Sequence, residues 1–275
     1  MVETPGISQS QYLPNVDRIS VLGGMITLAY VLTHFINIPI KELAVQLPSI
    51  YLAVQINVNT LVAILVAGLT AAGADWIYHD HPALKGKTIS YLILPALTSL
   101  VIGFPLAQLP FGIAWWLGIA AGVLVLVLVL IGEYISINAK DVRQPLAAAG
   151  LTAVSFALYL VMATSLRSEG TRLFLALPGL AVGAWLVSLR VLHLRLHGQW
   201  LVYEAAIIAF IVSQLVAAFF YWPVTPIAFG VLVVGPSYAL LSLFIGLIEE
   251  KPIRQVLIEP ALAVLISIGV AIWAS

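Results

Sequence analysis

Long apolar runs alternate with short polar connections along the whole chain. The runs have the length, about 20 residues, at which a helix crosses a hydrocarbon core of about 30 Å. A continuous apolar run predicts a helix rather than a barrel strand, because a helix satisfies its backbone hydrogen bonds within itself. We place membrane-spanning helices at residues 19–38, 58–78, 88–109, 111–133, 145–166, 172–192, 200–222, 226–248 and 256–274.

The segment between the first two runs, residues 41–57, is too short and too polar to cross a membrane, and it contains Pro48. We expect an amphipathic or re-entrant piece on the outer surface. No linker, charge run or low-complexity stretch divides the chain. The pattern therefore predicts one all-α, polytopic membrane domain over residues 1–275, with residues 1–18 as a cytoplasmic N-terminal segment.

The basic residues predict which side of the membrane each connection faces. Only three of the twelve Lys and Arg residues lie in one set of alternate connections, namely Lys41, Arg167 and Arg172. The other nine lie in the opposite set: Arg18, Lys85, Lys87, Lys140, Arg143, Arg190, Arg195, Lys251 and Arg254. Because positively charged loops stay in the cytoplasm, we expect the N-terminus inside and the C-terminus outside.

Composition excludes several classes of protein. With 62% hydrophobic and 9% charged residues, the chain has too little polar surface for a water-soluble globule, in which about a quarter of residues are charged. A net charge of zero provides no basic field for phosphates, so nucleic acid is not an expected partner. Cysteine is absent, which excludes thiolate chemistry and cysteine metal sites. Membrane lipids are the expected partners, with other membrane subunits or a second copy as alternatives, and the sequence requires no cofactor.

Glycine and proline interrupt the eighth run at Gly235 and Pro236, beside Ser237 and Tyr238. A proline removes one helical hydrogen bond and kinks the helix, and this kink can serve packing alone. The alternative is a broken helix that lines a cavity at the middle of the membrane, as in transporters with discontinuous helices.

Two pairs of glycines are spaced by four residues, Gly118 with Gly122 and Gly179 with Gly183. Such pairs allow two helices to approach closely, either within the chain or between two copies. The fourth and eighth runs also share a pattern, beginning Ile-Ala-aromatic and ending Ile-Gly at the same offset. The shared pattern indicates a duplication of four helices with the ninth appended, and chance similarity between apolar helices is the alternative.

The seventh run carries an ionisable group, Glu204, about one turn inside its start. We expect it to pair with Arg190 or Arg195, and a proton relay is the alternative. Five residues also recur along this run at roughly helical spacing and form a partly polar stripe, which we expect to face the helix bundle. Its members are Tyr203, Phe210, Gln214, Ala217 and Tyr221.

Four of the five histidines follow the second and sixth runs, on the predicted cytoplasmic side. Asp75 with His79, and His193 with His197, are spaced by four residues, which places each pair on one helix face. These four side chains form a candidate metal site for zinc or a similar ion. One alternative is an anion site in which the histidines and four basic residues, Lys85, Lys87, Arg190 and Arg195, bind the phosphate headgroup of a phospholipid or polyprenyl lipid. Another is plain interfacial solvation of polar side chains.

The layout of nine helices, with polar loops after the second and sixth, resembles that of the UbiA-type prenyltransferases. The run DWIYHDHPALKGK, from Asp75, lies where their first aspartate-rich loop would be. That resemblance implies a lipid-modifying enzyme that holds magnesium diphosphate through aspartates. The chain departs from the pattern, because Ala74 replaces the usual asparagine and the second loop has no aspartate.

No catalytic motif is recognisable, so a non-enzymatic role is favoured. The first hypothesis is a small-solute transporter, or an integral subunit of a membrane complex, in the cytoplasmic membrane of a prokaryote. The alternative is a lipid-binding or lipid-modifying enzyme with a His/Asp/Arg cluster on its cytoplasmic face. The candidate substrate- or lipid-binding residues are Arg190, Arg195, Lys85, Glu204, Gln214 and Tyr238.

Overall fold

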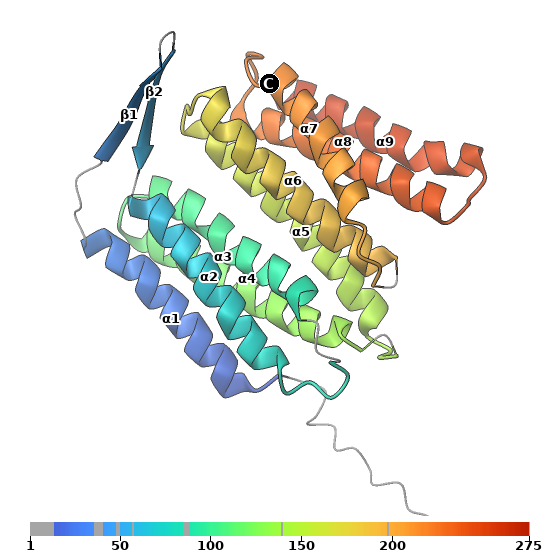
Figure 1. Ribbon diagram of the computed structural model, residues 1–275, viewed down its shortest axis with the longest axis horizontal. Helices are drawn as coiled ribbons and strands as arrows, with labels where there is room; N and C mark the ends of the chain where they lie inside the picture. The colour runs from blue at the N-terminus through green and yellow to red at the C-terminus, as the bar shows by residue number, and fades with distance from the viewer. Residues whose placement is uncertain are drawn as a thin grey trace, which may run out of the picture. The chain divides into compact units, whose positions relative to one another are not determined.

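The computed structural model of the protein describes residues 14–35, 41–47, 50–56, 58–84, 88–138, 140–196 and 198–274. Within these ranges the chain forms nine helices, each long and apolar enough to cross a membrane, and one two-stranded hairpin (Figure 1). The predicted all-α, multi-pass membrane fold is confirmed. Which side each terminus faces stays a prediction.

The helix bounds follow the hydropathy pattern closely. They are α1 (Val16–Phe35), α2 (Val58–Tyr78), α3 (Ile89–Gln108), α4 (Ile113–Ser136), α5 (Gln144–Ser168), α6 (Leu173–Arg195), α7 (Val202–Phe219), α8 (Pro226–Ile248) and α9 (Ile253–Trp273). The largest difference from a predicted end is three residues, as at the end of α6, predicted at 192 and observed at Arg195. The predicted end of the first helix, at 38, lies outside the described residues.

Residues 41–57 contain a β-hairpin, which the hydropathy pattern did not predict. Strands β1 (Lys41–Leu47) and β2 (Ile50–Ile56) pair antiparallel, with Lys41 opposite Ile56 and Leu47 opposite Ile50. Two short aliphatic runs separated by Pro48 and Ser49 are a hairpin signal, because turn residues between such runs favour strand pairing. The predicted outer-surface location of this segment stays a prediction.

The helices cluster into two compact units. The first comprises Met1–Gly103 and Pro110–Ala147, and the second comprises Phe104–Leu109 and Ala148–Ser275. The main division falls after Ala147, within the first turn of α5 and close to the boundary of the predicted duplication. The end of α3, from Phe104, belongs to the second unit. The duplication and the single membrane domain both stay predictions.

Close helix contacts hold the first unit together at small residues. A Cβ added to Gly73 of α2 would lie 2.5 Å from Leu22 of α1, and one added to Gly122 of α4 would lie 2.8 Å from Ile102 of α3. The Tyr30 hydroxyl of α1 donates a hydrogen bond to the Ser99 carbonyl of α3 at 2.5 Å. Gly122 therefore serves a contact within the chain, one of the two roles predicted for it.

In the second unit α8 packs against α6, α7 and α9. Gly235 lies directly against Ser267 of α9, and a Cβ added to Gly246 would lie 2.9 Å from Val256. The helix runs without interruption from Pro226 to Ile248 and contains Pro236. The alternative of a broken helix at Gly235 and Pro236 is therefore wrong. The packing role agrees with the structure, because Gly235 allows close packing of α9.

The predicted inward stripe of α7 is also wrong. Tyr203 is 84% exposed and Phe210 is 66% exposed, and Gln214 is exposed as well. The buried face of this helix consists of small and aliphatic residues, Ala205, Ile208, Ala209, Val212 and Val216. Lipid is as apolar as a helix interface, so close packing of small residues rather than polarity decides which face turns inward.

Candidate functional site

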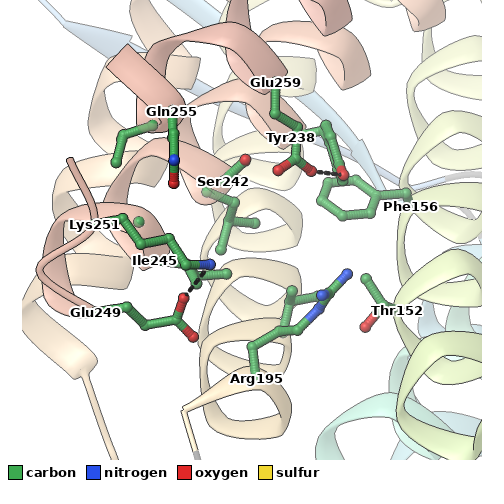
Figure 2. A pocket seen from close by; sticks show the side chains of 14 residues that line it. Thr152, Phe156, Arg195, Tyr238, Ser242, Ile245, Glu249, Lys251, Gln255 and Glu259 are labelled. Atoms are coloured by element: carbon green, nitrogen blue, oxygen red, sulfur yellow. Dashed lines mark hydrogen bonds and ion pairs between the residues drawn. The ribbon is translucent and has the colours of Figure 1, made fainter. Parts of the chain in front are cut away.

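A cavity of about 370 Å³ lies between helices α5, α6, α8 and α9 of the second unit (Figure 2). Its volume falls in the lower part of the range of small-molecule sites. Much of its lining is polar although the four helices are apolar overall. The polar lining residues are Thr152, Arg195, Tyr238, Ser242, Glu249, Lys251, Gln255 and Glu259, and the apolar ones include Phe156, Leu241 and Ile245.

A tight connection between α8 and α9 brings the polar residues of these two helices together. Only residues 249–252 separate the helices, and Glu250 adopts a left-handed backbone with φ of 53°. A short connection makes the two helices antiparallel neighbours. As a result, Glu259 of α9 lies beside Tyr238 of α8, although 21 positions separate them in the sequence.

Two polar pairs line the α8 and α9 side of the cavity. The Tyr238 hydroxyl donates a short hydrogen bond to Glu259 Oε1. Nearer the helix ends, Lys251 Nζ lies 2.6 Å from Glu249 Oε2, with 55% of the lysine side chain exposed. The Glu249–Lys251 pair lies at the α8–α9 connection and marks the mouth of the cavity. The Tyr238–Glu259 pair lies further along the two helices, and Glu259 is exposed there too.

Arg195 of α6 and Phe156 of α5 line the other side of the cavity. Arg195 is the last residue of α6, and Figure 2 shows its side chain extending toward Thr152 of α5, below Phe156 and Tyr238 in the view. The rings of Phe156 and Tyr238 meet edge to face with centroids 5.4 Å apart. In the described part of the chain, Arg195 forms no hydrogen bond and no ion pair. It is nevertheless close enough to Glu259 and Tyr238 to interact with both electrostatically.

The structure brings together two of the predicted binding residues, Arg195 and Tyr238. Glu204, Gln214 and Arg190 do not line this cavity, and Lys85 lies outside the described residues. Their roles in binding stay predictions.

The predicted ion pair of Glu204 is wrong. In the part of the chain that the structure describes, no salt bridge joins Glu204 to Arg190 or Arg195. The Arg190 side chain, from the last part of α6, is buried in the protein, and Arg195 lines the cavity instead. Position near a helix end did not determine which way these side chains point.

Glu259, Ser242, Gln255 and the Glu249–Lys251 pair are cavity residues that the sequence reasoning missed. A signal for them was present in the short α8–α9 connection, which makes the two helices neighbours. Because α8 and α9 are neighbours, their polar side chains could have been predicted to face each other.

The four predicted metal ligands divide between the units. Asp75 and His79 belong to the first unit, His193 belongs to the second, and His197 lies outside the described residues. Within the described ranges no group of three or more His, Asp or Glu side chains has the arrangement of a metal site. The complete set with His197 stays a prediction.

The connection after α2 has a defined structure of its own. Arg18 of α1 forms a salt bridge with Asp80 at 2.5 Å, and it donates a hydrogen bond to the Trp76 carbonyl at 2.6 Å. The adjacent His81 is buried, its ring contacts the Tyr134 ring at 4.5 Å, and its Nδ1 accepts a hydrogen bond from the Ala83 backbone N–H. An Nδ1 that accepts this bond carries no proton.

Burial lowers the pKa of His81 from its usual value of 6.5, so acid should destabilise the protein. The unfolded chain binds the proton at a higher pH than the folded chain, so stability falls as the pH drops from about 6.5 to the folded pKa. The loss is about 1.4 kcal/mol for each unit by which the pKa is lowered. We expect thermal unfolding in detergent to show a smaller decrease in Tm between pH 7.5 and 5 for His81→Gln than for the wild type.

The exposed neighbour His79 provides the matched control for this prediction. His79→Gln should show the same decrease in Tm with acid as the wild type. An equal decrease in wild type and His81→Gln would assign the acid sensitivity to other groups.

Comparisons with known proteins give one positive finding. Residues 38–274 match the family model described as Protein of unknown function (DUF5656). Because the match covers most of the chain, the chain belongs to this family. No curated protein and no solved structure matches the chain.

Proposed function

We propose that this DUF5656 member transports a small polar solute across the cytoplasmic membrane of a prokaryote, and that the solute binds in the cavity of the second unit. The observation that supports the proposal is the polar lining of this cavity, contributed by four apolar helices. Ionisable side chains within membrane helices are unfavourable unless they are paired or line a water-filled path. A purely structural subunit would have no need for these groups.

The depth of the cavity favours transport over surface binding. Between Tyr238 and Glu249, α8 rises about 16 Å at about 1.5 Å per residue. This distance is about half the thickness of the hydrocarbon core, which is about 30 Å. With Glu249 at the membrane surface, Tyr238 lies near the middle of the membrane, where transporters hold their substrates.

The charge pattern predicts that the mouth of the cavity faces the cytoplasm. Arg195, Glu249 and Lys251 all lie at the helix ends whose connections are rich in Lys and Arg. The solute would therefore enter this conformation from the inner side.

Thiol labelling tests the proposal cleanly, because the chain contains no cysteine. Ser242→Cys places a thiol in the cavity, and Ser237→Cys places one in the buried face of the same helix. In inside-out vesicles, a charged, membrane-impermeant methanethiosulfonate should label Ser242→Cys rapidly and Ser237→Cys hardly at all. Equal, slow labelling of both variants would contradict a cavity open to water.

The same variant separates transport from simple binding. A transporter must expose its site to each side in turn, so the reagent added outside intact cells should also label Ser242→Cys, though more slowly. Labelling from the inner side only would contradict transport and leave a binding protein.

A further inference from the structure

The cavity is lined by equal numbers of positive and negative side chains. Two of these side chains pair with each other, and the other two can bind a ligand. The charged lining residues are Arg195, Lys251, Glu249 and Glu259, two of each sign. Lys251 and Glu249 form a salt bridge with each other at the mouth. Arg195 and Glu259 are the remaining charges, and they come from different helices, α6 and α9.

Arg195 and Glu259 both line the cavity and do not form a salt bridge in the described residues. They nevertheless interact electrostatically. Tyr238 holds Glu259 on its own side through the hydrogen bond to Oε1. The space between a guanidinium and a carboxylate held in this way suits a molecule that carries both signs of charge.

We infer that the ligand is a small zwitterion, with a carboxylate or phosphate group bound by Arg195 and an ammonium group bound by Glu259. This inference rests on the proposed function for the existence of a ligand cavity. A guanidinium binds carboxylate and phosphate oxygens through two parallel hydrogen bonds. Phe156 and Tyr238 add aromatic rings beside the carboxylate, and aromatic rings attract ammonium groups.

The balance of charge disfavours ligands with one sign only. A simple anion bound at Arg195 would face the Glu259 carboxylate, and a simple cation bound at Glu259 would face the guanidinium. The volume of about 370 Å³ holds a small molecule or the headgroup of a lipid. A free solute such as phosphoethanolamine and the headgroup of phosphatidylethanolamine share the required chemistry.

The experiment measures how well defined probes protect Ser242→Cys from the thiol reagent. The purified variant in nanodiscs of phosphatidylglycerol is mixed with phosphoethanolamine, inorganic phosphate or ethanolamine, and a parallel sample uses nanodiscs that contain phosphatidylethanolamine. We expect phosphoethanolamine, or the phosphatidylethanolamine discs, to slow labelling at least about tenfold, the effect of about 1.4 kcal/mol of binding energy. Protection by the soluble probe identifies a free solute, and protection by the lipid alone identifies a headgroup.

Adding Arg195→Gln or Glu259→Gln to the labelled variant should abolish the protection. The matched controls Arg254→Gln and Glu250→Gln change exposed charges near the cavity that do not line it, and protection should persist. Arg195→Lys and Glu259→Asp keep the charges and should retain part of the protection. A single symmetrical peak in size-exclusion chromatography verifies that each variant is folded.

The outcomes separate the two proposals. Protection by phosphate or by ethanolamine equal to that by the zwitterions would overturn the inference, as would rapid labelling that no probe slows, and in both cases the open cavity would stand. Absence of labelling in Ser242→Cys without any probe would overturn the cavity itself.

Discussion

Replacing Gly235 with Leu should destabilise the protein by about 3 kcal/mol, because overpacking a close helix contact forces the backbones apart. Gly235 of α8 lies against the Cβ and Oγ atoms of Ser267 in α9, with no room for a side chain. The same two helices supply Tyr238 and Glu259 to the cavity. Thermal unfolding in detergent, followed by size-exclusion chromatography of the heated sample, measures the loss.

Two further variants make the reason for this loss testable. Gly269 of α9 has open space around it, so Gly269→Leu should leave the Tm nearly unchanged. Gly235→Ala should destabilise the protein less than Gly235→Leu. Adding Ser267→Gly to Gly235→Ala should restore stability, because the atom then nearest to the new Cβ is the Ala263 carbonyl oxygen at 3.6 Å. Equal stability of Gly235→Leu and Gly269→Leu would contradict the packing account.

Reporter fusions should place the two termini on opposite sides of the membrane. Green fluorescent protein at the N-terminus should fluoresce, because it folds in the cytoplasm, and alkaline phosphatase at the C-terminus should be active, because it needs the oxidising outer side. The expectation follows from the nine helices of the described residues and from nine basic residues in one set of connections against three in the other.

Internal fusions provide the control for this topology. Phosphatase fused after residue 222 should be active, because that connection lacks nearby basic residues. Phosphatase fused after residue 143 should be inactive, because that connection contains Lys140 and Arg143. Both termini in one compartment would contradict the predicted sidedness, including the inner-facing mouth of the cavity.

Hydropathy predicted the helices well because the membrane itself sets their length. The range 226–248 was predicted and observed without any difference, and no compared end differs by more than three residues. The same uniform hydropathy hides which way each helix faces, because lipid and helix interior are equally apolar. The inward stripe of α7 and the ion pair of Glu204 were wrong for this reason.

The candidate site was predictable only in part. Arg195 was chosen for its charge and Tyr238 for its position beside Pro236, but their common cavity depends on how α5, α6, α8 and α9 pack. Glu259 was not among the predicted site residues, and its pairing with Tyr238 follows from the short link between α8 and α9. Helix adjacency, rather than residue type, was the missing information.

The four-residue link between α8 and α9 also constrains how the protein is made. The final two helices leave the ribosome in immediate succession, so they can enter the bilayer as a preformed helical hairpin. In the predicted topology, Glu249, Glu250 and Lys251 then stay on the cytoplasmic side, and Glu259 enters the bilayer within α9. A nascent chain that ends before α9 lacks one wall of the cavity and leaves the Tyr238 hydroxyl without its carboxylate partner, Glu259.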